Sequence, residues 1–428
     1  MSGQGDLVDL VIEKPAAGGR MLARLHGQIV LVAGAIPGER VRARLDSKRG
    51  GVLFATAVDV LEPSPDRRPP GEDPACGGRQ FAHIAAPRQR ALKAEIARDA
   101  FARIAHLELP AELPVHASPE EGYRMRARLH VQGARLGFFR EGTHQLCDPR
   151  CSRQLLDETI DVVAAVSAVL AATGMSDGRT LELSENVAAT NRVLYLEVST
   201  MGRGGVALDA LLDLPGVTGV GIARAGEPLS AKGSPVVADD LAVQSPTGAT
   251  GTLRLQRHVT GFFQGNRFLL GCLVDRVLTQ VPDGPMADLY AGVGLFGLAH
   301  VALGRGDVVA VEGDAGSIED LEANAAPYGD RVRVDTRSVE EALRHRHTVD
   351  GRTTVVDPPR TGLSREALAA LVAARPPRVV YVSCDVATLA RDAAALTVAG
   401  YDVMAAEIFD LFPGTAHVET MVSMARRD

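Results

Sequence analysis

The amino-acid sequence predicts an α/β fold at its C-terminal end, an α+β middle region and a small β-barrel at its N-terminal end. From residue 286 onward, short apolar strands alternate with helical stretches, which is typical of a doubly wound parallel sheet. Five short β-favouring runs separated by glycine turns fill the first 62 residues, and a proline-rich linker follows them. Between these two ends the pattern mixes strands and helices.

The 428 residues exceed one typical domain, and we expect three, over 1–62, 63–258 and 259–428. Hydrophobic residues make up 46% and charged residues 23%, which excludes a disordered chain. No apolar run approaches the ~20 residues of a membrane helix, and the first residues lack the pattern of a signal peptide. Five cysteines do not make a disulfide scaffold. We therefore expect a cytoplasmic monomer with reduced thiols and no membrane partner.

The net charge of −7 argues against a nucleic-acid partner, but the charge is unevenly distributed. Residues 1–150 hold 22 Lys and Arg against 18 Asp and Glu, whereas residues 151–428 hold 24 against 35. Such asymmetry indicates that the N-terminal part meets a polyanion. A compositional bias toward arginine explains the same density, because only 4 of the 46 basic residues are lysine.

The first 62 residues predict a barrel of the oligonucleotide-binding kind. Its strands are expected at 7–12, 21–25, 29–32, 40–45 and 53–60. Because side chains alternate along a strand, Arg40, Arg42 and Arg44 share one face, where they suit a phosphate backbone. A solvated face without a ligand explains the row equally well.

The remaining chain predicts a helix from Pro87, another over 155–170 beside alternating runs such as 193–198, and then the C-terminal sheet. The strands of that sheet are expected at 287–290, 308–312, 332–334, 353–356, 379–383, 403–408 and 418–424, with helices between the first six such as 315–325 and 365–374. Only a short turn-rich link precedes the last strand, so that strand is expected to run antiparallel to its neighbour. The sheet is therefore predicted to hold six parallel strands and a reversed seventh.

A glycine-rich turn follows the first strand of this sheet and opens a helix. It includes Tyr290, Gly292 and Gly294, and glycine lets the backbone approach a ligand at a helix N-terminus. Glu312 ends the next strand 20 positions after Gly292, where a carboxylate can bind ribose hydroxyls. The pattern fits a dinucleotide and S-adenosylmethionine alike, and a tight turn without a ligand is a third interpretation.

Further loops are expected at the same ligand-binding edge of the sheet. Asp357 and Arg360 are the first and last residues of an Asp-Pro-Pro-Arg loop, although such a sequence is often a plain turn. Cys384 opens a helix, where a thiol tends to have a lowered pKa and to act as a nucleophile, and a buried structural cysteine is the alternative. His417 and Glu419 are expected on one face of the last strand, where a carboxylate can serve as general base.

Ahead of the sheet, Phe263-Gln264-Gly265-Asn266 carries amides that can hydrogen-bond a polar ligand, although Asn266 can instead cap a helix. Together these motifs resemble the uracil-C5 RNA methyltransferase family, in the family's order over the C-terminal 170 residues or so. The resemblance implies a Rossmann-like class I methyltransferase domain. Ala35-Ile-Pro-Gly-Glu-Arg-Val41 looks like the small RNA-binding barrel called TRAM, and Tyr123-Arg-Met-Arg126 and Cys76-Gly-Gly78 are similar to the family's middle region.

The resemblance implies roles for these residues. Cys384 is the implied nucleophile, which adds to uracil C6, and Glu419 is the implied base, which removes the C5 proton. The implied cofactor is S-adenosylmethionine, held by Gln264, Tyr290, Gly292, Gly294, Glu312 and Asp357. The candidate RNA contacts are Arg40, Arg42, Arg44 and Arg360, of which Arg360 is also a candidate to orient the base or Asp357. Leu295 stands where several members place a polar residue near the cofactor, and Ala291 replaces a frequent cysteine.

Some family members hold an iron–sulfur cluster with four cysteines, and this sequence departs from their pattern. Arg79 and Pro70 occupy two of the implied ligand positions, while Cys76 remains and Cys151 matches the fourth. Two thiolates cannot supply the four ligands that such a cluster usually needs. We interpret the chain as a lineage without the cluster.

The expected function is methylation of uracil C5 in RNA to 5-methyluridine. A TRAM-like barrel is commoner in members acting on 23S ribosomal RNA, so ribosomal RNA is favoured over transfer RNA. An RNA cytosine-C5 methyltransferase typically places a second cysteine where Arg360 stands here, and this difference favours uracil over cytosine as the substrate. A nicotinamide-dependent oxidoreductase leaves Cys384 and Glu419 unexplained, and a non-catalytic RNA-binding module needs no methyl donor.

Overall fold

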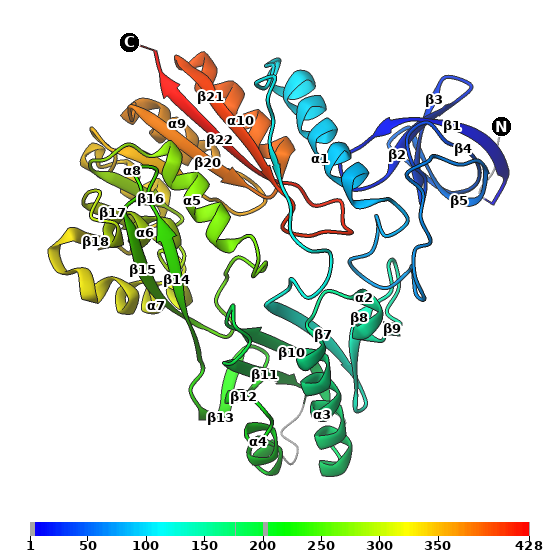
Figure 1. Ribbon diagram of the computed structural model, residues 1–428, viewed down its shortest axis with the longest axis horizontal. Coiled ribbons are helices and arrows are strands. Elements are labelled where there is room, and N and C mark those ends of the chain that lie inside the picture. Colours follow the sequence, from blue (N-terminus) through cyan, green and yellow to red (C-terminus); the bar gives the residue numbers. More distant parts are fainter. Residues whose placement is uncertain (1–4, 176, 200–203, 428) are drawn as a thin grey trace.

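A computed structural model describes the chain except for residues 1–4, 176, 200–203 and 428. Figure 1 shows the N-terminal barrel on one side of the molecule, the C-terminal sheet on the other and a third sheet below them. None of the helices in the described part is both long and apolar enough to cross a membrane.

The N-terminal strands close into a barrel in the order β1-β2-β3-β5-β4, which confirms the predicted small OB/TRAM-like domain. They are β1 (Leu7–Pro15), β2 (Met21–Leu25), β3 (Gln28–Ala33), β4 (Arg40–Arg49) and β5 (Val52–Glu62). The barrel core continues into the next segment through Phe81, Ile84 and Leu92, all fully buried. Arg67 also donates to the buried Glu39 at 2.6 Å. The barrel is therefore docked on the rest of the chain through a shared core.

The middle sheet has seven strands in the order β13-β12-β11-β10-β7-β8-β9. They are β7 (Arg126–Gln132), β8 (Arg135–Phe139), β9 (Leu146–Cys147), β10 (Gly178–Glu185), β11 (Arg192–Val198), β12 (Val217–Arg224) and β13 (Glu227–Gly233). The accompanying helices are α2 (Pro149–Ser152), α3 (Asp157–Thr173) and α4 (Gly204–Leu212). This mixture of strands and helices agrees with the α+β pattern of the sequence.

The C-terminal sheet has the order β18-β17-β16-β19-β20-β22-β21-β6. Its strands are β16 (Met286–Leu289), β17 (Val308–Val311), β18 (Val332–Asp335), β19 (Thr353–Val356), β20 (Arg378–Ser383), β21 (Tyr401–Phe409), β22 (Glu419–Arg426) and β6 (Val115–His116). The helical segments are α6 (Leu295–Ala302), α7 (Ala315–Ala325), η2 (Ala326–Arg331), α8 (Val339–Leu343), η3 (Arg346–Thr348), α9 (Arg365–Ala374) and α10 (Val386–Val398). Because β22 is antiparallel to both β20 and β21, the predicted reversal of the seventh strand is confirmed.

Segments from before residue 259 also pack on this sheet. The strand β6 pairs with β21, and α1 (Ala86–Ala100) and η1 (Phe101–Ala105) bury apolar side chains against the sheet and α10. The ribbon of β14 (Val236–Gln244) and β15 (Thr250–His258) shares a core with α5 (Leu270–Gln280) and α6. The sequence pattern missed these attachments, because edge strands as short as β6 have no periodicity to detect.

Candidate active site

The predicted site residues meet at one edge of the C-terminal sheet. The parallel strands β16, β17, β19 and β20 end there, and the antiparallel β22 begins there. Ser383 of β20 pairs with Thr420 of β22. Because the two strands are antiparallel, Cys384 and Glu419, which come next at this end of the pair, lie side by side. The reversed strand is thus what carries a carboxyl group to the thiol.

The turn between β16 and α6 is built for close backbone approach. Tyr290, Gly292 and Gly294 all have positive φ angles, of 59°, 56° and 94°. A Cβ on Gly292 would meet no atom within 4 Å, so this turn borders open space. Leu295 is buried in the apolar core and offers no polar group to that space.

Glu312 closes the same turn from the next strand. Its two carboxylate oxygens accept hydrogen bonds from the backbone N–H groups of Gly292, at 2.8 Å, and Asp314, at 2.7 Å. Each oxygen keeps a second lone pair for a ligand hydroxyl. The predicted position of Glu312 beside the glycine turn therefore agrees with the structure.

Asp357 and Gln264 face each other across the site. The Gln264 amide donates to the Asp357 carboxylate at 3.4 Å. Burial raises the pKa of Asp357 above its usual range, and the hydrogen bond from Gln264 opposes that shift. Asn266, in contrast, is buried, and its Oδ1 accepts from the N–H groups of Phe268 and Leu269. It caps the turn before α5, so Gln264 carries the polar function of this motif.

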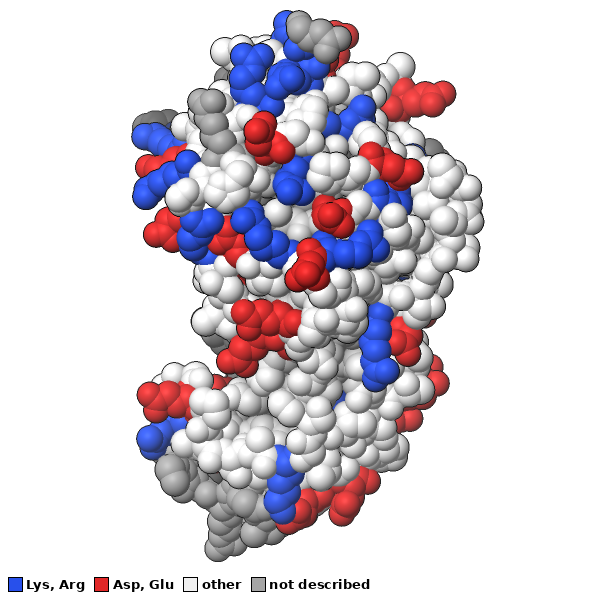
Figure 2. Space-filling model, turned by 90° about the vertical axis from the view of Figure 1, so that its left-hand side faces the viewer, with Lys and Arg blue, Asp and Glu red and all other residues white. Residues whose placement is uncertain are grey.

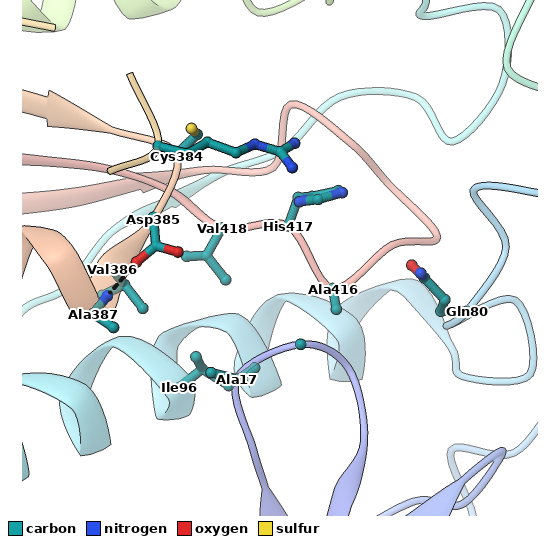
Figure 3. Close-up of a pocket in the computed structure, with 12 residues that line it drawn as sticks. Ala17, Gln80, Ile96, Cys384, Asp385, Val386, Ala387, Ala416, His417 and Val418 are labelled. Atoms are coloured by element: carbon teal, nitrogen blue, oxygen red, sulfur yellow. Dashed lines mark hydrogen bonds between the residues drawn. The ribbon is translucent and has the colours of Figure 1, made fainter. Parts of the chain in front are cut away.

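Cys384 is half-buried between β20 and α10, and its pKa is raised to about 11. Burial is the main cause and the Glu419 charge adds to it, while a hydrogen bond from Arg360 and its charge lower the pKa. The expected lowering of the pKa by the helix N-terminus is wrong, because Asp385 caps that terminus through the N–H groups of Ala387 (Figure 3) and Thr388. The resting enzyme therefore holds a protonated thiol beside Arg360.

Glu419 is buried, and its pKa is raised well above the usual value by burial and by the negative charge of Asp357, with Arg360 opposing. His417 does not share a strand face with it, because β22 begins only at Glu419. The His417 ring instead packs edge-on against Phe412, with ring centroids 5.7 Å apart. Burial lowers the pKa of His417, and the nearby Arg360 and Lys93 add to that effect.

The sequence did not reveal how the loop before β22 is held. On α1, the fully buried Lys93 pairs with Asp410 and donates to the carbonyl of Phe412 at 3.1 Å. Gln89 accepts the N–H of Gly414 at 2.9 Å. One signal was present: Lys93 lies beside Leu92 and Ile96 on a helix whose apolar face is otherwise free of charge.

The barrel arginines lie as the strand pattern predicts, but they are not free cations. Arg42 donates to Asp9 at 2.9 Å, Arg40 pairs with Glu62 at 3.1 Å, and Arg44 lies 3.6 Å from Asp46. On the molecular face drawn in Figure 2, basic and acidic side chains are likewise interspersed. Each arginine of the predicted row therefore has an acidic neighbour on the barrel itself.

The cysteines of the middle region depart from the expected reduced state. Cys76 and Cys147 form a disulfide, whereas Cys151 is a free thiol. Arg79 donates to the carbonyl oxygens of Cys151, at 2.6 Å, and of Pro70. The guanidinium of Arg79 thus links two segments that hold implied ligand positions of the iron–sulfur cluster, those of Pro70 and Cys151.

Comparisons with known proteins point to one family. Residues 266–427 match the family described as tRNA (Uracil-5-)-methyltransferase. The chain is 33% identical to the 23S rRNA (uracil(1939)-C(5))-methyltransferase RlmD of Halomonas elongata, over 98% of this chain and 90% of that protein. It is 30% identical to the corresponding enzyme of Bordetella bronchiseptica, over 97% and 92% of the two chains.

One solved structure has the same architecture throughout. It is the tRNA (uracil-54, C5)-methyltransferase of Pyrococcus abyssi in complex with S-adenosyl-L-homocysteine, with a TM-score of 0.72, 22% identity and coverage of 98% of this chain and 100% of that one. The agreement confirms the predicted three-part fold with its Rossmann-like domain. With relatives this similar over nearly its whole length, the chain belongs to the family of uracil-C5 RNA methyltransferases.

Proposed function

We propose that this enzyme methylates C5 of uracil in ribosomal RNA through a covalent bond between Cys384 and C6 of the base. The observation that carries the proposal is the β20–β22 register, which brings Cys384 and Glu419 side by side within reach of the Arg360 charge. A thiol that can form a covalent adduct and a carboxyl that can take a proton are the two groups that C5 methylation of a poorly nucleophilic pyrimidine requires.

The proposed cofactor is S-adenosylmethionine, held by Gln264, Tyr290, Gly292, Gly294, Glu312 and Asp357. The open space at Gly292 and the spare lone pairs of Glu312 fit the adenosine part of such a ligand. The carboxylates of Glu312 and Asp357 also match its positive charge. When bound, S-adenosylmethionine supplies an electrophilic methyl group.

The residues of the chain carry out the remaining chemistry. Cys384 first releases its thiol proton to solvent, a loss that the positive charge of Arg360 favours. The thiolate then bonds to C6 and places negative charge on C5 and O4 of the ring. Once C5 carries both a methyl group and its original proton, the Glu419 carboxylate takes that proton. The C5–C6 double bond then forms again as the bond from C6 to sulfur breaks, which frees Cys384.

Ribosomal RNA is favoured because the names of the two relatives above specify 23S rRNA. The first alternative is the same chemistry on transfer RNA, and the second is methylation of cytosine C5 in RNA. The target base must leave its stack to reach Cys384, so a loop or a flipped nucleotide is expected. We assign RNA binding to residues 1–62 and 63–258 and methyl transfer to residues 259–428, in a cytoplasmic monomer.

Mapping of methylated nucleotides in total RNA from a deletion strain tests this assignment. We expect one 5-methyluridine to disappear from large-subunit ribosomal RNA and to return when the wild-type gene is restored. Loss of the mark from transfer RNA would support the first alternative, and loss of a 5-methylcytidine would support the second.

Changing Arg40, Arg42 and Arg44 together to alanine is expected to weaken RNA binding and to flatten its salt dependence. Each free arginine on a phosphate adds roughly one unit to the salt slope, but RNA must here displace Asp9, Glu62 and Asp46. The slope should therefore fall by fewer than about three units, with cofactor affinity unchanged. An unaltered slope in filter-binding titrations would place the RNA elsewhere.

The protein is expected to hold no iron–sulfur cluster, because Arg79 and Pro70 stand where two ligands are needed and Cys76 is bonded to Cys147. Anaerobically purified protein should be colourless and free of stoichiometric iron by metal analysis. Brown protein with about four irons per chain would overturn this expectation.

A further inference from the structure

A cavity of about 210 Å³ lies between the barrel and the catalytic thiol. Its walls come from the β1–β2 turn of the barrel (Ala17 and Gly18), from Ile96 on α1, from the start of α10 and from the loop before β22. Cys384, which Figure 3 labels, and Arg360 also line it. Roughly seven waters would fill this volume, so it suits one planar group rather than a whole nucleotide.

The barrel turn reaches this cavity through two glycines. Gly18 and Gly19 have φ angles of +86° and +87°, which favour glycine. A Cβ on Gly19 would lie 2.7 Å from the Cβ of Ala416, so only glycine lets the turn approach the loop that carries His417. A Cβ on Gly18 would meet no atom within 4 Å, which leaves open space beside this turn.

Two polar side chains of the cavity, Gln80 and His417, suit a base. The Gln80 amide, which lines it, makes no hydrogen bond with any described residue, and an amide offers both a donor and an acceptor. Figure 3 shows this amide directed toward the loop of Ala416 and His417. The lowered pKa of His417 keeps its ring neutral near pH 7, and an imidazole ring can stack on a base.

Building on the proposed function, we propose that this cavity binds the base of an RNA nucleotide next to the target uridine. The barrel turn is one wall, Gln80 contacts the edge of the base and His417 contacts its face. The target uracil itself must touch both Cys384 and Glu419, and Glu419 does not line the cavity. The proposed cofactor residues Gln264, Glu312 and Asp357 do not line it either. The barrel thus helps to select the nucleotide beside the reaction.

The test uses total RNA from the deletion strain as substrate and compares Gly18→Leu with Gly27→Leu. Gly27, in the β2–β3 turn, has a φ angle of +84° and no atom within 4 Å of a Cβ, so it matches Gly18 in strain and in space. We expect Gly18→Leu and Gln80→Ala to lower kcat/KM about tenfold or more while S-adenosylmethionine affinity is kept, and Gly27→Leu to match wild type. An RNA transcript with an abasic site beside the target should lose the same factor with wild-type enzyme and nothing more with Gln80→Ala.

Equal kcat/KM for Gly18→Leu and Gly27→Leu would overturn the inference, as would additive losses from Gln80→Ala and the abasic site. If Gly18→Leu does not fold, Gln80→Ala and the abasic transcript decide alone. Wild-type enzyme that methylates no RNA from the deletion strain would instead overturn the proposed function, and the inference with it.

Discussion

Changing Cys384 to alanine is expected to abolish methyl transfer, with a loss of at least about 1,000-fold in turnover. The thiol is the proposed nucleophile at the sheet edge, and without its addition to C6 the ring cannot place charge on C5. S-adenosylmethionine affinity should stay within about twofold of wild type, because the thiol acts on the base and not on the cofactor.

Transfer of labelled methyl groups to RNA and calorimetric titration of S-adenosylmethionine measure these two effects. Cys151→Ala is the matched control, since Cys151 is also a free, partly buried cysteine but lies in the middle region. Turnover by Cys384→Ala within about tenfold of wild type would exclude covalent catalysis by this residue.

Much of this site follows from strand order alone. The alternation of strands and helices predicted the sheet, and the short link before the last strand predicted its reversal. That reversal is sufficient to bring residue 419 to the edge where residue 384 emerges, although they are 35 positions apart in the chain. Parallel strands end at one edge, so the loops of Tyr290, Glu312 and Asp357 were also expected to meet.

The electrostatics of the site could not be predicted from the sequence. A helix N-terminus lowers a thiol pKa only where its N–H groups remain unpaired, and here Asp385 occupies them. Burial and the neighbouring Glu419 then decide the direction of the shift. The ion pairs of the barrel arginines could not be predicted for a related reason, since strand alternation says which face a side chain occupies but not that Asp9 lies across from Arg42.

Contacts between segments that are distant in the chain could not be predicted from the sequence either. Lys93 and Asp410 are 317 positions apart, and the barrel turn and Ala416 are separated by nearly the whole chain. The Gly18-Gly19 pair indicated only a turn, because a glycine required for close packing against another segment has the same local pattern as one required for a tight bend.

Changing Glu419 to glutamine is expected to trap the enzyme on its RNA. Glutamine keeps the size and much of the hydrogen bonding of the side chain but cannot take a proton. Addition of Cys384 and methylation of C5 can still occur, whereas elimination cannot follow while C5 keeps its proton. Removal of the carboxylate also removes one cause of the raised pKa of Cys384, which favours the thiolate and hence the adduct.

On a denaturing gel, the trapped species should migrate slowly and carry label from the methyl donor. The band should vanish in the Glu419→Gln, Cys384→Ala double variant, because that variant cannot form the bond to C6. His417 is the rival base, since it lies two residues away and also interacts with Arg360. If His417→Asn accumulated the adduct and Glu419→Gln turned over normally, His417 would be the base. The neutral, ring-packed His417 and the buried carboxyl beside the thiol favour Glu419, because its raised pKa makes its carboxylate a stronger proton acceptor than an ordinary glutamate.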